Sequence, residues 1–540
     1  MPSDLVGHIF LGAIGYFMYL LLKYHDRAIG TTKKNDSKFP EIPAWPILGQ
    51  IPNAIANFSQ PLELGMTRHL KYRPGWSMTM PGLRIIDVSK PEWLEHVQKT
   101  NFLNYVKGSL YHSVMTDVFG NGILVTDGTR WKKNRHILAP LFSVKSFQAC
   151  ISPSLRFNLD CLLDGLELAS ENRPTLDICD VLLKFTLNFI VHATLGKDLG
   201  QLDRIHLPPI RSSSPSPNAK FAEDFDYAQN QMDFRFAFVT FWKVIEKVHF
   251  RLGRKIKSAC DTLNQYATSL INERMAKFDL DAQKDEESPT DLLGFFLKMR
   301  KEMGDDLGEE EIRDALVNLI IAGRDSTGEA LSWAFYHLLM NQDLVAKIRE
   351  EASIITSQDR AGQVTYGNNK EFKWAHAVIL ETLRLHPSIP KNIRFALKAD
   401  KIPDGPVIEA GDAVRWSDWS MGRDPDLWGE DCLEFKPSRW IDEKGNIKQF
   451  GQFKYHAFNA GPRICLGMTL GIFQCVSLIV EVFHKFEVEF AQDWLQHVPR
   501  SPIIGDSSSS SYLYHTPKYK PSLTLPMAQP MLVTIKPYQG

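Results

Sequence analysis

The sequence predicts a mainly α-helical protein with small β-sheets, preceded by one N-terminal transmembrane helix. Apolar residues recur at helical spacing over most of the chain, whereas strand-like alternation is confined to short stretches near residues 75–90 and 530–536. Residues 5–22 are apolar or small except His8. With 540 residues, 44% of them hydrophobic, the chain can bury a large core.

The N-terminal apolar segment is long enough to be a membrane anchor. Residues 5–22 would form about 27 Å of helix, close to the thickness of a thin bilayer. Basic residues follow this segment and none precedes it: Lys23, Arg27, Lys33, Lys34 and Lys38. This asymmetry places the following domain in the cytosol, and the flanking residues do not resemble a cleaved signal peptide. We therefore expect residues 1–22 to be an uncleaved, single-pass anchor in the endoplasmic reticulum membrane.

Residues 23–49 are expected to link this anchor to the rest of the chain. Pro40, Pro43 and Pro46 recur at every third position, which is typical of a stiff, extended hinge. Polar or proline-rich stretches at 207–218 and 279–288 predict surface loops. We expect residues 50–540 to form one domain.

Helical periodicity dominates this domain. The expected helices lie near residues 90–98, 129–142, 174–195, 221–246, 250–277, 290–302, 309–340, 342–355, 370–385 and 465–485. Pro81-Gly82 predicts a hairpin within residues 75–90, and Met531, Val533 and Ile535 predict a strand. The apolar run 466–482 is long enough for a second membrane span, but its internal polar residues favour a buried core helix.

Charge and cysteine content narrow the possible functions. The net charge of -1 provides no basic field, so we expect no nucleic-acid partner. The seven cysteines form neither a CxxC pair nor a cluster with zinc-ligand spacing. The pattern favours a reduced, cytosol-facing protein with one special thiol rather than a disulfide framework.

Cys465 is the candidate for that special thiol. Gly461 and Gly467 flank it, and such glycines allow the backbone to turn tightly around a large ligand. The expected helix begins at this point, and its free N–H groups stabilise a thiolate. A soft sulfur held in this way suits iron, whereas a buried, inert cysteine is the alternative for a lone thiol.

The pattern Phe458-x-x-Gly461-x-Arg463-x-Cys465-x-Gly467 resembles the heme-binding loop of the cytochrome P450 superfamily at every defining position. Further segments resemble motifs of that superfamily, in its order: Trp131-x-x-x-Arg135, residues 322–327, Glu381-x-x-Arg384 and residues 435–440 with Arg439. The resemblance covers residues 39–540. It implies the cytochrome P450 fold and a heme-thiolate monooxygenase domain over residues 50–540.

The same resemblance implies how heme b would be bound. Cys465 is implied as the axial thiolate ligand of the iron, a ligand that favours cleavage of the O–O bond. The implied cofactor-binding residues are Cys465, Arg463, Phe458, Gly467, Trp131, Arg135 and Arg394. Guanidinium groups among them would pair with the heme propionates.

Two further groups of residues receive implied roles. Glu381 and Arg384 lie on one helical face and are expected to form a buried structural network with Arg439, although an isolated pair of this spacing is commonly a surface ion pair. The implied catalytic residues are Asp325, Ser326 and Thr327. They would relay protons for oxygen activation. Ser326 stands where the superfamily usually has threonine, so Thr327 is expected to share the relay.

Electrons are expected to come from another protein. No GxGxxG motif follows a strand, and 540 residues leave no room for a flavin domain beside the heme domain. The resemblance implies NADPH-cytochrome P450 reductase as the donor of NADPH-derived electrons, with cytochrome b5 as a second candidate. Lys132, Lys133 and Lys454 are candidate docking residues, and solvated surface lysines are the alternative.

Aromatic residues between Phe221 and Trp242 predict an apolar substrate that arrives from the bilayer, although core packing would also explain several of them. By resemblance, further pocket candidates are residues 105–110, Leu319, 389–392 and 525–527. Several motifs are most similar to the plant and fungal branch that hydroxylates fatty acids or alkanes at or near the terminal carbon. That reaction is the predicted function. The alternatives are hydroxylation of a terpenoid, polyketide or other secondary metabolite, and a non-enzymatic membrane heme protein.

Overall fold

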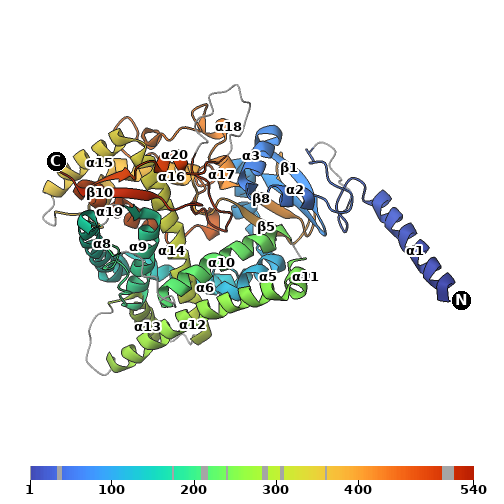
Figure 1. The fold of residues 1–540 in the computed structure, drawn as a ribbon, viewed down its shortest axis with the longest axis horizontal. Coiled ribbons are helices and arrows are strands. Elements are labelled where there is room, and N and C mark those ends of the chain that lie inside the picture. Colours follow the sequence, from blue (N-terminus) through green and yellow to red (C-terminus); the bar gives the residue numbers. More distant parts are fainter. Residues whose placement is uncertain are drawn as a thin grey trace.

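The computed structural model of the protein describes residues 2–32, 39–172, 175–207, 217–238, 241–281, 290–303, 309–358, 362–501 and 516–539. Figure 1 shows a mainly helical body with small sheets, as the sequence predicts. Residues 33–38 of the expected linker and most of the loops expected at 207–218 and 279–288 lie outside the described residues.

Four helices form the centre of the core: α9 (Ile178–Leu195), α14 (Glu309–Leu339), α16 (Lys373–Leu385) and α19 (Met468–Lys485). Helix α14 contacts the other three, and Figure 1 shows it passing through the body. Helices α9 and α19 are long and apolar enough to cross a membrane, but 72% and 67% of their residues are buried inside the protein. Apolar side chains around the whole helix are typical of such core positions.

The remaining helices surround this centre. Their bounds are α2 Ile51–Ala56, α3 Pro61–Tyr72, α4 Pro91–Glu95, α5 Gly108–Phe119, α6 Gly128–Leu138, α7 Val144–Ser146, α8 Ser152–Asn172, α10 Pro217–Ala237, α11 Trp242–Val248, α12 Phe250–Asp281, α13 Leu292–Met303, α15 Gln342–Gln358, α17 Asp418–Met421, α18 Pro425–Trp428 and α20 Trp494–His497. Short 3-10 and π turns occur between several of them, including Gly461–Arg463 just before α19.

The strands form three sheets in the described part of the chain. Their bounds are β1 Gly75–Met80, β2 Leu83–Val88, β3 Tyr105–Val106, β4 Leu176–Asp177, β5 Asn392–Ala396, β6 Asp400–Lys401, β7 Val407–Ile408, β8 Ala413–Trp416, β9 Phe486–Phe490 and β10 Leu532–Pro537. The largest sheet has the order β1-β2-β8-β5-β3, the second β4-β10-β9 and the third β6-β7. Among these described strands, β2 and β8 pair in parallel and the other pairs are antiparallel.

The two strand predictions are confirmed. Strands β1 and β2 form an antiparallel hairpin that pairs Gly75 with Val88 and turns at Pro81-Gly82. Strand β10 buries Val533 and Ile535 on the face that the alternation indicates. The remaining strands were not predicted, because several have only two to five residues and depend on partners distant in the sequence.

Some helix predictions differ from the structure. The helix expected at 221–246 is divided, since α10 ends at Ala237 and α11 begins at Trp242. The helix expected at 174–195 begins later, because Asp177 accepts a hydrogen bond from the Cys179 N–H at 3.1 Å and caps α9. Helix α8 was missed, although its buried leucines recur at helical spacing, so the periodicity was available in the sequence.

Helix α1 (Pro2–Lys23) projects away from the body (Figure 1). Its apolar side chains are largely exposed, with Val6, Ile9 and Phe10 each at 66%. The proline-rich stretch that follows lies along the edge of β1, where the Ile42 N–H donates to the Ser77 carbonyl at 2.9 Å. Nearer to α1, the Ala28 N–H donates to Thr79 Oγ1 at 3.0 Å, which ties the segment after α1 to the largest sheet.

Candidate active site

A cavity of about 610 Å³ lies between α14 and the loop that precedes α19. It collects side chains from distant parts of the sequence. The residues of the expected cofactor-binding and catalytic sets that line it are Trp131, Arg135, Asp325, Ser326, Thr327, Arg394, Phe458, Arg463, Cys465 and Gly467. The expected network of Glu381, Arg384 and Arg439 lies outside this lining.

The loop 458–467 presents Cys465 to the cavity. The Cys465 N–H donates to the Phe458 carbonyl at 2.9 Å and closes the loop. Asn459 and Gly461 both have positive φ angles, of 62° and 61°. A β-carbon at Gly461 would lie only 2.6 Å from the Gln98 carbonyl oxygen, so both conformation and space require glycine.

The free surface of Cys465 borders the cavity. Because the surrounding protein removes bulk water, burial raises the pKa of Cys465. Two other influences oppose this shift: a hydrogen bond from the Gly467 N–H and the positive charge of Arg135 both lower the pKa of Cys465. Both stabilise a thiolate, the form of cysteine that binds a metal.

A cluster of cations lines the cavity on its α5–α6 side: Lys107, Arg135, Arg394 and Arg463. Asp127 partly compensates this charge, with its Oδ1 2.7 Å from Arg463 Nη2. The buried Nε of Arg463 has no hydrogen-bond partner among the described residues. Burial, followed by the neighbouring Arg394, lowers the pKa of Arg463 to about 10, as expected for crowded like charges.

These observations fit a heme. The Cys465 sulfur supplies a soft ligand with an open face, while the cation cluster and the orphaned Arg463 Nε suit the two carboxylates at a heme edge. The Arg463 guanidinium also lies over the Trp131 ring, 4.5 Å from its centroid. Lys107 was expected only as part of a pocket stretch, and no motif in the sequence marks it as a member of the cation cluster.

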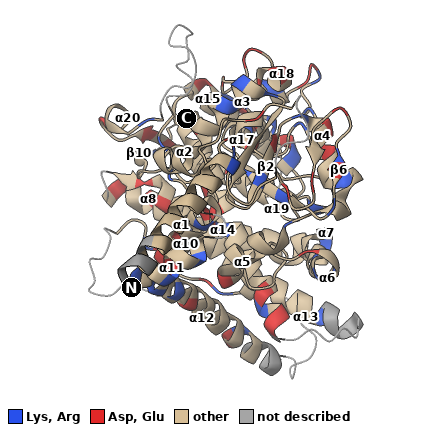
Figure 2. Cartoon of the chain, turned by 90° about the vertical axis from the view of Figure 1, so that its right-hand side faces the viewer, with Lys and Arg blue, Asp and Glu red and all other residues tan. Residues whose placement is uncertain are grey.

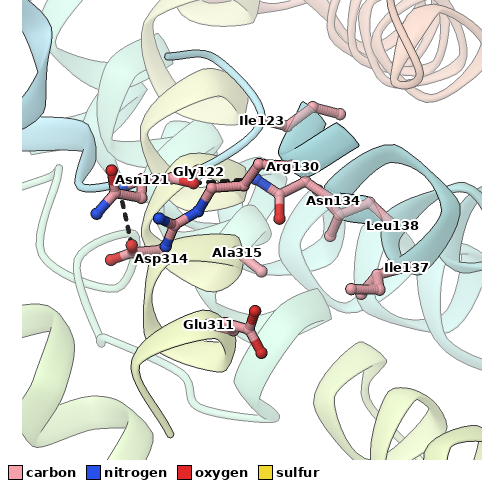
Figure 3. A pocket seen from close by; sticks show the side chains of 10 residues that line it. All are labelled: Asn121, Gly122, Ile123, Arg130, Asn134, Ile137, Leu138, Glu311, Asp314 and Ala315. Carbon is pink, nitrogen blue, oxygen red and sulfur yellow. Dashed lines mark hydrogen bonds between the residues drawn. The ribbon is translucent and has the colours of Figure 1, made fainter. Parts of the chain in front are cut away.

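Two side chains of α14 hold the loop that leads into α6 beside the cavity. Asp314 Oδ2 accepts from the Asn121 N–H at 2.8 Å, and Asn318 Oδ1 accepts from the Leu124 N–H at 3.2 Å. Figure 3 shows Asp314 next to Asn121. It also shows Asn134 of α6, whose amide donates to the Asn121 carbonyl at 3.0 Å. These bonds position the helix that carries Trp131 and Arg135.

The residues of the expected proton relay occupy the α14 wall of the cavity. Ser326 Oγ donates to the Ala322 carbonyl at 2.6 Å, and Ser388 Oγ donates to the Ser326 carbonyl at 2.6 Å. Asp325 accepts from the Gln229 amide and lies 2.9 Å from Arg324 Nη1. Burial is the largest influence on Asp325 and raises its pKa to about 6, although Arg324 opposes the shift.

A second buried carboxyl, Glu329, was missed by sequence reasoning. Its two oxygens accept from Thr524 Oγ1 and from the Leu525 N–H, each at 2.8 Å. Thr524 also lies 3.3 Å from Gln229 Oε1, so hydrogen bonds connect α10, α14 and the C-terminal segment at the cavity wall. A glutamate inside the apolar run that follows Thr327 was the available signal.

Glu381 and Arg384 form a fully buried, bidentate ion pair, with both distances 2.8 Å. Arg384 also donates to the carbonyls of Cys432 at 2.6 Å and Glu434 at 2.9 Å. Arg439 reaches the same carboxylate at 3.4 Å. The structure thus brings the three expected network residues together away from the cavity, where they bind α16 to the segment 432–440.

Some of the other residues predicted to form the substrate pocket line the cavity, and others do not. The candidates that line the cavity are Lys107, Leu110, Phe225, Phe236, Leu319, Ile389, Lys391 and Asn392. Residues 525–527 do not line it, whereas Leu523 and Thr524 do. Phe221 packs in the core against Phe225 and Tyr266 instead. Among the candidate docking lysines, Lys133 pairs with Glu311 at 2.8 Å.

Known proteins similar to this chain share one family. Residues 40–504 match the family model described as cytochrome P450. The chain is 37% identical over 537 residues to cytochrome P450 monooxygenase cyp1 of Mycosarcoma maydis, covering 98% of this chain and 79% of that protein. It is 29% identical to cytochrome P450 86B1 of Arabidopsis thaliana, covering 84% and 81%, and 28% identical to cytochrome P450 94A2 of Vicia sativa, covering 89% and 91%.

Proposed function

Since this chain belongs to the cytochrome P450 family and is a heme-thiolate monooxygenase, we propose that it hydroxylates a fatty acid or a fatty-acid-derived chain at or near its terminal carbon. The observation that carries the proposal is the cavity, which extends from Cys465 to the far wall formed by α2, α3 and β1. Its lining is predominantly apolar, and the part of it beyond the heme residues, towards this far wall, suits an apolar chain.

We assign the predicted residues to binding the heme. Cys465 would ligate the heme iron, with Phe458 and Gly467 beside it in the cavity lining. Arg135, Arg394 and Arg463 would bind the propionates, with Trp131 packed between them. When bound, the heme supplies the chemistry by which dioxygen is activated and one oxygen atom is inserted into a C–H bond. The surrounding protein orients the substrate and limits the entry of water.

The α14 wall would supply protons. Asp325 has a pKa close to neutral because it is buried, and such a group can both hold and release a proton under working conditions. Ser326 already donates to a carbonyl of its own helix, so its hydroxyl can exchange that partner for a ligand in the cavity. Thr327 lines the same wall and would share this role.

Asp325→Asn is expected to lower the fraction of consumed NADPH that yields hydroxylated product by roughly tenfold or more, with hydrogen peroxide formed instead, because proton transfer contributes such factors. Wild-type coupling should be higher below pH 6 than above it, since the carboxyl loses its proton as the pH rises through its pKa of about 6. The variant should lack this inflection. NADPH consumption, peroxide and product measured from pH 5.5 to 8 test this.

Ser326→Thr keeps the hydroxyl and serves as the matched control for Ser326→Ala. The threonine variant should couple at least as well as wild type, whereas the alanine variant should release more peroxide. Equal coupling in all three proteins would contradict a role for Ser326 in proton delivery.

We also propose that the protein is anchored in the endoplasmic reticulum membrane by α1, with its catalytic domain in the cytosol. Helices α2 and α11 lie on the side of the body from which α1 projects, the side that faces the viewer in Figure 2. Besides the apolar side chains of α1, large apolar side chains of α2 and α11 are exposed. The most exposed are Ile55 at 57%, Val244 at 58% and Val248 at 78%. Such a surface can enter the bilayer and admit an apolar substrate from it.

Family members take electrons from a redox partner. For this chain we propose NADPH-cytochrome P450 reductase, with cytochrome b5 as a second donor, docking on the side of the Cys465 loop. Lys132 and Lys133 are exposed there on α6. Their positive charge suits an acidic partner surface.

The substrate proposal is tested with full-length protein in microsomes containing the reductase and NADPH. Incubation with saturated fatty acids of different lengths should yield products oxidised at or near the terminal carbon. Terpenoid substrates are the comparison, because a secondary-metabolite hydroxylase would share the same site. Turnover of terpenoids without any turnover of fatty acids or their derivatives would refute the proposal.

A further inference from the structure

The cavity contains a second group of cations, on the wall formed by α2, α3, β1 and β2. Arg68 of α3 and Arg415 of β8 line this wall, together with apolar residues such as Leu64, Met80 and Ile85. In Figure 1, α3 and β1 lie on the side of the body from which α1 projects, whereas α19, which follows the Cys465 loop, lies in the opposite half, near α8 and β10.

The charges on this wall are not balanced. Asp87 is buried and forms a bidentate ion pair with Arg415, with N···O distances of 2.7 and 2.8 Å. Arg68 has neutral partners: its Nη2 donates to Gln50 Oε1 at 2.6 Å, and its Nη1 lies 3.5 Å from the Met78 sulfur. Within the described residues, no carboxylate forms an ion pair with Arg68. Two guanidinium groups therefore share one carboxylate, and one positive charge remains.

The partners of Arg68 hold it in place without neutralising it. The Gln50 amide is itself fixed, because its Nε2 donates to the Pro43 carbonyl at 2.7 Å and its Oε1 also accepts from Asn53 at 2.9 Å. Burial and the neighbouring Arg415 lower the pKa of Arg68 to about 10, so the guanidinium remains charged at neutral pH. A fixed, charged guanidinium beside an apolar cavity favours a ligand with a carboxylate at one end.

We propose that Arg68 binds the carboxylate of the substrate, while its hydrocarbon chain extends through the apolar cavity towards Cys465. This inference rests on the proposed function, because it assigns the head group of the acyl chain. It also explains which carbon of the chain is oxidised. Binding the carboxylate at the wall of α3 leaves the opposite end of the chain to approach the heme, so oxidation occurs at or near the terminal carbon. Alkanes and esters would lack this contact.

The inference is tested by substrate-induced changes in the heme absorbance of the full-length, purified holoenzyme. Titrations compare hexadecanoic acid with its methyl ester in wild type, Arg68→Gln and Arg68→Lys. Wild type should bind the acid about tenfold more tightly than the ester. Arg68→Gln should raise the Kd of the acid about tenfold and leave that of the ester within twofold. Arg68→Lys keeps the charge but not the bidentate geometry, and it should be intermediate.

Lys71→Gln is the matched control, since Lys71 is an exposed cation of the same helix that does not line the cavity. This change should leave both Kd values unaltered. The carbon monoxide difference spectrum of each variant verifies that heme is bound normally. Arg68→Glu reverses the charge at this position. This variant should bind dodecyltrimethylammonium, a cation that cannot ligate iron, more tightly than wild type does.

The outcomes separate this inference from the proposed function. If wild type binds and hydroxylates fatty acids but Arg68→Gln weakens acid and ester equally, or weakens neither, the assignment of Arg68 is wrong and the proposed function stands. If wild type neither binds nor oxidises acids or esters, the proposed function itself fails, and with it this inference.

Discussion

Cys465→Ser should abolish hydroxylation and eliminate the absorbance band of thiolate ligation in the reduced, carbon monoxide-bound protein. A serine hydroxyl does not ionise near neutral pH and is a poor ligand for heme iron, so the electron donation that favours O–O cleavage is lost. The loop should keep its shape, because the bond between the backbone N–H of residue 465 and the Phe458 carbonyl does not involve the side chain. We therefore expect activity below detection in a folded protein.

Cys161→Ser is the matched control for this change. Cys161 is a partly buried cysteine of α8 that does not line the cavity. Its replacement should leave the carbon monoxide spectrum and turnover within about twofold of wild type. Circular dichroism of both variants separates loss of a ligand from loss of the fold. A Cys465→Ser protein that retains the thiolate-type band would overturn the assignment of Cys465.

Glu381→Ala should destabilise the protein severely and prevent stable binding of heme. Removing one partner of a buried ion pair leaves the other charge uncompensated, at a cost of about 3–5 kcal/mol. Here Glu381 also accepts from the Lys436 N–H at 2.8 Å and from Trp440 Nε1 at 2.9 Å, so further buried donors lose their acceptor. Thermal unfolding and the yield of heme-containing protein measure the effect.

An exposed ion pair provides the comparison. Lys184 and Asp180 of α9 are 2.6 Å apart with side chains 38% and 53% exposed. Lys184→Ala should change stability by no more than about 0.5–1 kcal/mol, because exposed pairs contribute little. If Glu381→Ala unfolds at the same temperature as Lys184→Ala, the network around Glu381 does not stabilise the fold as we propose.

Local motifs made the heme region predictable. The segment 458–467 contains its own turn, ligand and helix start, so the surroundings of Cys465 can be inferred from adjacent residues. Arg135, Arg394 and Arg463 belong to separate motifs, and the structure brings them to one cavity. The pattern predicted Asp325 and Ser326 as neighbours on α14, but their partners Gln229 and Ser388 come from other elements.

Contacts between distant segments explain what was missed. Lys107 lies among the guanidiniums because β3 and α5 place it there, and no periodicity indicates that position. Glu329 would be unfavourable in an apolar helix alone, but it is satisfied by Thr524 and Leu525, almost two hundred residues later. The short strands β5 and β8 likewise depend on pairing partners distant in the sequence rather than on local propensity.

By itself, the sequence determined the fold class and the heme-thiolate chemistry, because both are encoded by local periodicity and by motifs whose residues lie within one turn or loop. Only the tertiary structure decided which groups face the substrate. Arg68, Asp87 and Arg415 belong to no recognisable motif. The uncompensated charge of Arg68 follows from the ion pair between Asp87 and Arg415, which are 328 positions apart in the sequence. Net charge in a buried cavity is a property of such long-range pairings, so the sequence alone does not reveal it.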